Sequence, residues 1–145
     1  MKKFLLLIAA TALSVGSMVA GDRYSRNIAD LPATAQTTIQ QNFKAKLSVI
    51  KIDSGITGIS EYEVVLTDGT EITFDRNGEW RDIEVAIGKK VPDYFVPQTI
   101  RNYIKANNQN RKVVSIEKNR NTYEVELENG VEMKFDRAGN FIRYD

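Results

Sequence analysis

The residues best suited to chemistry in this sequence are its carboxylates, because the chain contains no His and no Cys. Without His it lacks the commonest general base and the commonest transition-metal ligand. Without Cys it also lacks thiolates for zinc or iron–sulfur sites. The carboxylates are spread along predicted strands, which is typical of a solvated face rather than of an acid–base couple. The composition therefore predicts a protein that is not an enzyme and has no cofactor.

Calcium is the one metal that the remaining oxygen ligands could bind. Asp75, Asn77 and Glu79 alternate along the chain as in the first half of an oxygen-rich calcium loop. The same segment also fits a tight hairpin, in which Asn77-Gly78 supplies the positive φ of the turn. The second copy of this segment, 136–140, keeps the turn glycine but lacks the middle oxygen ligand. We therefore favour the turn and keep calcium as the alternative.

A segment of 19 residues occurs twice in the chain, 61 positions apart. Residues 62–80 and 123–141 are identical at 10 of these 19 positions without a gap. In both copies Asp-Gly or Asn-Gly separates runs of alternating apolar residues, which indicates a β-hairpin. An apolar stripe of period 3.6, opened by Pro32 or Pro97, precedes each copy and predicts an amphipathic helix.

These elements predict an α+β fold of two tandem repeats, each one helix followed by a four-stranded antiparallel meander. Repeat 1 spans residues 31–87 and repeat 2 spans residues 91–145. A unit of this size buries little apolar surface alone. We therefore expect the repeats to pack together as one domain, residues 22–145.

Residues 1–21 have the pattern of a secretory signal peptide. Lys2 and Lys3 precede the apolar run 4–13, and small residues lead to a cleavage point near Ala20 or Gly21. The run is too short to span a bilayer comfortably, which takes about 20 apolar residues. We expect a periplasmic or extracellular protein with no membrane insertion after cleavage.

The charges of the chain almost cancel, which narrows the class of partner. The sequence has 20 Lys and Arg against 19 Asp and Glu, and removing Lys2 and Lys3 leaves 18 against 19. Nucleic acids and anionic membranes require a basic footprint that such a chain lacks. A protein or peptide partner is the remaining expectation.

Two aromatic residues, Trp80 and Phe141, occupy equivalent positions in the two copies. If Asn77-Gly78 is a two-residue turn, Asp75 pairs with Trp80, and both aromatics point to the sheet face that the helices leave open. A three-residue turn with a bulge would shift the register by one and bury Trp80, and this alternative stays open. Under the first register the predicted partner-binding residues are Trp80, Phe141, Val65, Glu124, Glu126 and Glu128.

The sequence resembles the PepSY-like family of exported bacterial proteins, which is also described as similar to the β-lactamase inhibitor protein. The resemblance covers residues 31–145 and rests on Leu-Pro or Val-Pro before a helix and on a repeated motif. That motif reads Tyr-Glu-Val-x-Leu-x-(Asp/Asn)-Gly-x-Glu-(Ile/Met)-x-Phe-Asp-Arg-x-Gly. The resemblance implies tandem helix-plus-four-strand units, a periplasmic or surface location and no established enzymatic activity.

Three functions are compatible with these observations. The leading hypothesis is a non-catalytic exported binding module that recognises a protein or peptide through its open sheet face. The first alternative is an inhibitor or regulator of a secreted hydrolase, a β-lactamase or protease, that presents the loop 54–59 with Ile56 and Ile59. The second is a calcium-responsive periplasmic protein, because some members of the family carry a label of calcium regulation.

Overall fold

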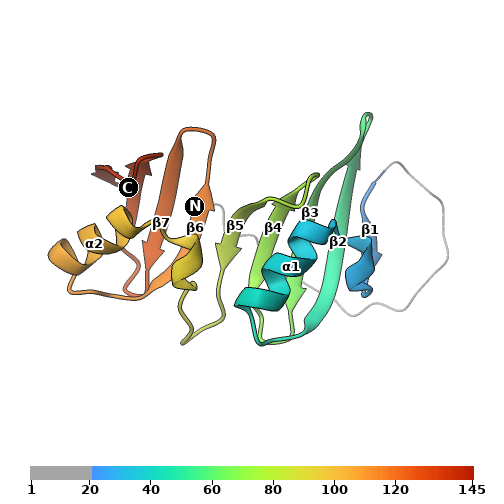
Figure 1. Cartoon of the computed structure of the whole chain (residues 1–145), viewed down its shortest axis with the longest axis horizontal. Helices are drawn as coiled ribbons and strands as arrows, with labels where there is room; N and C mark the ends of the chain where they lie inside the picture. Colours follow the sequence, from blue (N-terminus) through green and yellow to red (C-terminus); the bar gives the residue numbers. More distant parts are fainter. Residues whose placement is uncertain (1–20) are drawn as a thin grey trace.

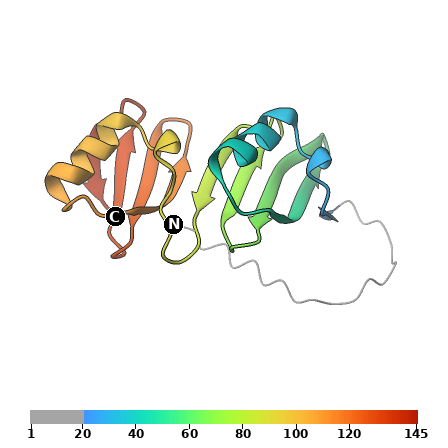
Figure 2. The same cartoon turned by 60° about the horizontal axis from the view of Figure 1, so that its bottom comes forward.

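The computed structural model describes residues 21–145, so the predicted signal peptide lies outside the described residues except for Gly21. The chain forms an antiparallel sheet, and both helices lie on the same face of it, as Figure 1 and Figure 2 show. The helices are α1 (Ala33–Asn42) and α2 (Gln98–Asn107), and two 3-10 turns, η1 (Ile28–Asp30) and η2 (Asp93–Phe95), precede them. The strands are β1 (Arg23–Ser25), β2 (Leu47–Gly55), β3 (Gly58–Leu66), β4 (Glu71–Asp75), β5 (Trp80–Glu84), β6 (Val113–Lys118), β7 (Thr122–Leu127), β8 (Glu132–Asp136) and β9 (Phe141–Tyr144).

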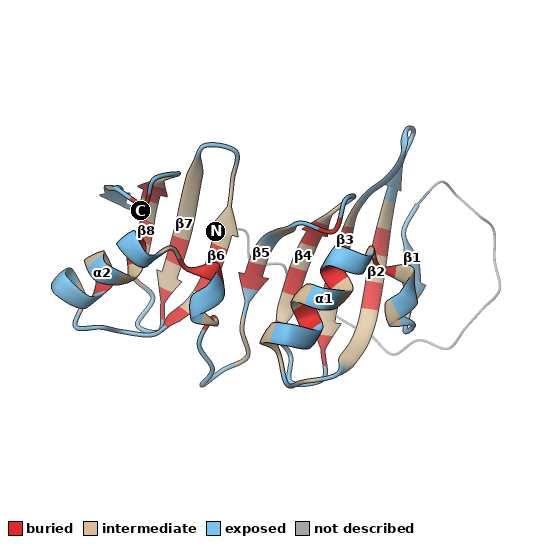
Figure 3. Ribbon diagram, viewed as in Figure 1, coloured by how far each residue is buried: buried red, intermediate tan, exposed pale blue. Residues whose placement is uncertain are grey.

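Alternation along each strand separates a helix-covered face from an open face. On β3, Tyr62, Val64 and Leu66 are buried, whereas the residues between them are half-buried. Figure 3 shows the buried positions as separate bands along the strands beneath the helices. The helices complete the core with small or aliphatic residues at helical spacing, namely Ala35 and Ile39 from α1 and Ile100 and Ile104 from α2.

The predicted architecture of two tandem helix-plus-four-strand repeats is wrong. Within residues 21–145 the structure has one continuous nine-stranded sheet in the order β1 to β9, with only two short helices of ten residues each. Two features account for the difference. First, the structure has a strand that the sequence pattern did not predict, β1, which pairs with β2. Second, β5 pairs directly with β6, so the strands of both repeats belong to one sheet. This pairing satisfies backbone groups that two separate sheets would leave on exposed edges.

Neither helix within residues 21–145 has the length and apolar character needed to cross a bilayer.

The predicted register of the β4–β5 hairpin is also wrong, because Trp80 pairs with Phe74 and not with Asp75. The Asp75 side chain accepts hydrogen bonds from the backbone N–H groups of Asn77 and Glu79, at 2.9 and 3.1 Å. These bonds, with Gly78 at φ 84°, extend the turn and introduce a register irregularity next to Phe74. Trp80 therefore lies on the helix-covered side of the sheet.

Two of the turn glycines also set how closely the hairpins approach the helices. A Cβ on Gly78 would lie 2.8 Å from the Pro32 Cβ at the start of α1. A Cβ on Gly139 would lie 2.8 Å from the Thr99 Cβ in the first turn of α2, and would overlap the Thr99 hydroxyl. The Thr99 hydroxyl donates a hydrogen bond to the Ala138 carbonyl at 3.1 Å. The two glycines thus allow each turn to support the first turn of a helix.

Phe95 packs the connection between β5 and α2 onto the rest of the core. It is 2 % exposed, and its ring stacks on Phe43, which directly follows α1, at a centroid distance of 5.7 Å. The same ring meets Trp80 edge to face at 5.4 Å. One side chain from η2 therefore contacts both the end of α1 and the start of β5.

We predict that Gly139→Ala destabilises the protein more than Gly130→Ala does. Both glycines have positive φ, so both substitutions introduce backbone strain of about 1–2 kcal/mol. A Cβ at Gly130 meets nothing within 4 Å, whereas one at Gly139 overlaps Thr99. Overpacking should add about 1–3 kcal/mol at Gly139 alone. Urea denaturation measures the difference, and equal losses would show that the helix contact is not tight.

We predict that Phe95→Ala lowers the free energy of unfolding by about 3–5 kcal/mol, as loss of a buried aromatic does. Tyr94→Ala is the matched control, because Tyr94 is adjacent and aromatic but 75 % exposed. It should cost far less. The denaturation midpoints of the two variants test this prediction. Similar midpoints would show that Phe95 does not contribute more to stability than the exposed Tyr94.

Candidate functional site

The open face of the central strands carries a row of carboxylates. β4 places Glu71 opposite Glu84 of β5, and β5 places Asp82 opposite Glu117 of β6. Glu126 continues the row on β7, directly across β6 from Glu84, since Ser115 pairs with both. We call these five residues the acidic row: Glu71, Asp82, Glu84, Glu117 and Glu126.

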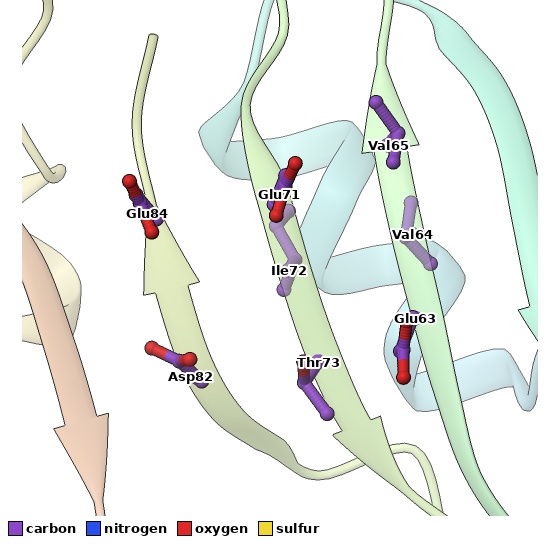
Figure 4. A pocket seen from close by; sticks show the side chains of 8 residues that line it. All are labelled: Glu63, Val64, Val65, Glu71, Ile72, Thr73, Asp82 and Glu84. Atoms are coloured by element: carbon purple, nitrogen blue, oxygen red, sulfur yellow. The ribbon is translucent and has the colours of Figure 1, made fainter. Parts of the chain in front are cut away.

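Figure 4 shows one end of the acidic row from the open side of the sheet. The carboxylates of Glu71, Asp82 and Glu84 stand on this side, while Val64 and Ile72 point toward α1. Next to these three carboxylates is a shallow hollow of about 20 Å³, which has room for a water molecule or a single small group. The hollow is also lined by Glu63, Val65 and Thr73.

The environment of the acidic row favours the protonated form of two members. The pKa of Asp82 is raised to about 7, first by burial and then by the negative charges of Glu117 and Glu84. One oxygen of this carboxyl, Oδ1, is buried without a hydrogen-bond partner among the described residues. Burial also raises the pKa of Glu71, with Glu84 and Glu63 adding to the effect.

The cations of the open face stand at its two ends. Lys51 on β2 lies 3.0 Å from Asp53 and 3.2 Å from Glu63. Burial alone would lower the pKa of Lys51, but these hydrogen bonds and charges raise it overall. Lys134 on β8 pairs with Glu124 at 2.7 Å. Among residues 21–145, no Lys or Arg forms an ion pair with a member of the acidic row.

Three of the predicted partner-binding residues lie on β3 and β7, and a fourth, Glu128, follows β7. Val65 and Glu126 stand on the open face, where Val65 lines the hollow and pairs with Glu71. Glu124 is on the same face but is neutralised by Lys134. Glu128 lies just beyond β7, and its Oε1 accepts the backbone N–H of Lys112 at 3.2 Å. The structure therefore brings Val65 and Glu126 to the acidic row and leaves Glu128 outside it.

The two predicted aromatic residues are on the opposite side of the sheet. Trp80 packs against Phe95, and Phe141 stacks on Tyr103 of α2 at 4.5 Å. Both are partly buried against the hydrophobic core. Their placement on the open face is wrong for the reason given above, the longer turn, which also pairs Phe135 with Phe141.

The residues of the calcium alternative take part in the β4–β5 turn. One Asp75 oxygen accepts two backbone N–H groups, and the other lies 3.5 Å from the Arg81 guanidinium. A second group of oxygen ligands, Asp53, Glu61 and Glu63, converges on the open face. The Lys51 ammonium contacts two of these three carboxylates and so already supplies a cation there.

The sequence pattern predicted only one member of the acidic row, Glu126. Glu71, Asp82, Glu84 and Glu117 come from three strands, and their proximity depends on the β5–β6 pairing. One signal in the sequence was available, since Asp82 and Glu84 alternate with the buried Ile83 as Glu124 and Glu126 do around Val125. Alternation reveals the face of each strand but not which strands are neighbours.

The β2–β3 hairpin holds the loop considered for hydrolase inhibition. Its tip projects beyond the sheet in Figure 1, and Ile56 at this tip is fully exposed. Ile59 is 38 % exposed, and Gly58 has φ 107°. Inhibition of a secreted hydrolase through this tip stays a prediction.

An antiparallel sheet that is covered by helices on one face only is an α+β architecture. The family model described as "Putative beta-lactamase-inhibitor-like, PepSY-like" matches residues 60–143. The chain belongs to this PepSY-like family, which confirms the resemblance seen in the sequence. No curated protein matches the chain significantly.

Three similar crystal structures come from Bacteroides species. One from Bacteroides vulgatus, a "putative periplasmic protein of unknown function", is 40 % identical, with a TM-score of 0.81 over 86 % of this chain and 99 % of its own. A second from Bacteroides vulgatus, also a "putative periplasmic protein", is 34 % identical, with a TM-score of 0.77 over 86 % and 96 %. A "putative calcium-regulated periplasmic protein" from Bacteroides thetaiotaomicron is 33 % identical, with a TM-score of 0.78 over 86 % and 96 %. The protein is periplasmic, which agrees with the periplasmic or extracellular location expected from its sequence.

We predict that the protein becomes less stable as the pH rises from about 4 to about 7, and that Asp82→Asn removes most of this trend. The pKa of Asp82 is about 7 in the folded protein, against about 3.9 in an unfolded chain. The folded state therefore binds a proton that the unfolded state has released, so stability falls with pH across this window, by at most about 1.4 kcal/mol per unit. Denaturation at several pH values measures it.

The matched control for this experiment is Glu84→Gln, which removes an exposed charge from the same strand. Glu84→Gln should retain most of the pH dependence because Asp82 is still present. A wild-type protein with constant stability between about pH 4 and pH 7 would contradict the assignment.

Proposed function

We propose that the protein is a non-catalytic periplasmic binding module whose acidic row holds a positively charged segment of a protein or peptide. The observation that carries this proposal is the cross-strand pairing of like charges on the open face. Glu71 faces Glu84, and Asp82 faces Glu117, without a cation paired to any of them among the described residues.

Like charges placed directly opposite one another destabilise a sheet. The acidic row therefore lowers the stability of the free protein, and the raised pKa of Asp82 reflects the same burial and repulsion. A bound Lys or Arg side chain would relieve the repulsion and supply charge-assisted hydrogen bonds. The arrangement is better suited to a complex than to the isolated chain.

The neighbouring residues support a partner that lies across the strands. Val65 and Thr73 line the hollow beside the carboxylates, so a partner meets apolar and hydroxyl surface as well as charge. Lys51 and Lys134 flank the row and are both engaged by carboxylates. Complementary charge of this type contributes most to the specificity and the rate of association.

We predict that the double variant Glu71→Gln/Glu84→Gln loses at least about tenfold in affinity for the partner, because each lost charge-assisted bond contributes 1.5–3 kcal/mol or so. The control is Glu79→Gln/Glu128→Gln, which removes the same number of charges outside the acidic row. Tagged wild-type protein and both variants are incubated with envelope extract, and the retained proteins are identified and titrated.

The proposal requires that capture weaken as the ionic strength rises from about 0.05 to about 0.5 M. It also requires cross-links between basic residues of the partner and β4 or β5. Capture that is equal for all three proteins would refute it. Because one similar structure is called calcium-regulated, millimolar calcium is included as a competitor, and loss of the partner in calcium but not magnesium would identify the acidic row as calcium-responsive.

A further inference from the structure

A groove on the helix-covered side, separate from the acidic row, is lined by cations. It has a volume of about 640 Å³ and lies between α2, the residues before it and the start of β6. Its floor includes the aliphatic side chains of Val91 and Ile104. Five cationic residues line it, against one carboxylate, Asp93. We call these five residues the basic cluster: Lys90, Arg101, Lys105, Arg111 and Lys112.

Local structure explains how these cations converge. Arg101 and Lys105 are four residues apart on α2 and therefore share one helix face. In Figure 1 the chain leaves the left end of α2 and runs back below the helix to β6. This reversal places Arg111 and Lys112 on the same groove as Arg101 and Lys105.

The reversal uses a backbone conformation that most residues avoid. Gln109 and Asn110 have φ of 55° and 53°, both in the left-handed region, and neither is Gly. A left-handed conformation costs a residue such as Gln about 1–2 kcal/mol, and it costs Asn less. Strain of this kind is concentrated at functional sites. Here the strained residues directly precede the two cations of the loop.

Internal partners neutralise only part of the basic cluster. Asp93 lies 3.2 Å from Lys90 and 3.6 Å from Arg101. The Arg101 guanidinium is held in place by the Val96 carbonyl and the Gln98 side chain. Among the described residues no carboxylate forms an ion pair with Lys105, Arg111 or Lys112. Three cations are therefore available to a ligand.

The structure contains an internal comparison for this groove. The corresponding groove beside α1 has a volume of about 500 Å³ but only two cations, Arg26 and Lys46. Its lining is more apolar and includes Phe43 and Leu47. A helix lying over a sheet therefore creates a groove in both places, but only the one beside α2 gathers a basic cluster.

We propose that the basic cluster is a binding site for a small ligand bearing oxyanions, a phosphate ester or a sulfate ester. The groove has the volume of a small-molecule site, which is typically about 300–1,000 Å³. Arg guanidinium groups hold phosphate and sulfate oxygens through paired hydrogen bonds, and Lys adds a mobile point charge. The clustered cations repel one another when the groove is empty, so a bound oxyanion relieves that repulsion.

Isothermal titration tests this site with two probes, inorganic pyrophosphate and a trisulfated disaccharide. We expect saturable binding of at least one probe to the wild-type protein with one site per chain. Binding of pyrophosphate alone indicates a phosphate ester as the ligand, and binding of the disaccharide alone indicates a sulfated sugar. Failure of both probes to bind saturably overturns the proposal.

Arg111→Glu/Lys112→Glu should weaken binding by at least about tenfold, because two charge-assisted contacts are lost. The matched control is Arg26→Glu/Lys46→Glu in the other groove, which changes the net charge equally and should alter the affinity by less than about twofold at physiological salt. Equal losses in both variants would assign the binding to overall charge and overturn the proposal.

Thermal melting checks that each variant is folded. If Arg111→Glu/Lys112→Glu does not fold, Lys105→Gln on the exposed face of α2 replaces it, and unchanged affinity in that variant would overturn the proposal. This experiment is independent of the acidic row, so the variants Glu71→Gln/Glu84→Gln should bind both probes like the wild type.

Discussion

The strands form one sheet because β5 pairs with β6 through Asp82, Ile83 and Glu84. This contact joins Ile83 and Ile116, both fully buried, into one core. The pleat of the strands then determines which side chains lie on the open face, since the residues next to a buried pair must point there. Asp82 and Glu117 consequently face each other, and the acidic row crosses the junction without interruption. Without this pairing the sheet would have two additional edges, and the carboxylates would belong to separate surfaces.

Charge is distributed unequally over a chain that is almost neutral in total. The open face collects the acidic row, and the groove beside α2 collects the basic cluster. Each arrangement costs stability in the free protein, through opposed like charges on the sheet and through repulsion and left-handed backbone at the groove. Proteins retain such costs most often where function requires them. Two oppositely charged sites on opposite faces could bind two different ligands without competing.

On the helix-covered face, close packing holds the hairpin turns, the helices and the connection before α2 against one another. Gly78 and Gly139 let their hairpin turns contact the first turns of α1 and α2. Phe95 joins the connection before α2 to Phe43 and Trp80. Trp80 also contacts the Lys118 ammonium, which lies 4.4 Å from the ring centroid. The aromatic residues of the repeated segments thus stabilise the core. The open face is lined mainly by carboxylates.

The sequence by itself determined the family, the export of the protein, both helices and the hairpins, because these depend on short motifs and on periods of 2 and 3.6 residues. It also placed Val65 and Glu126 on the open face. Only the tertiary structure decided that the strands form one sheet, that Trp80 and Phe141 lie beneath the helices, and that Glu71, Asp82, Glu84 and Glu117 meet. Strand neighbours and hairpin register depend on contacts between segments that are distant in the chain, and a shift of one residue reverses the face of every side chain.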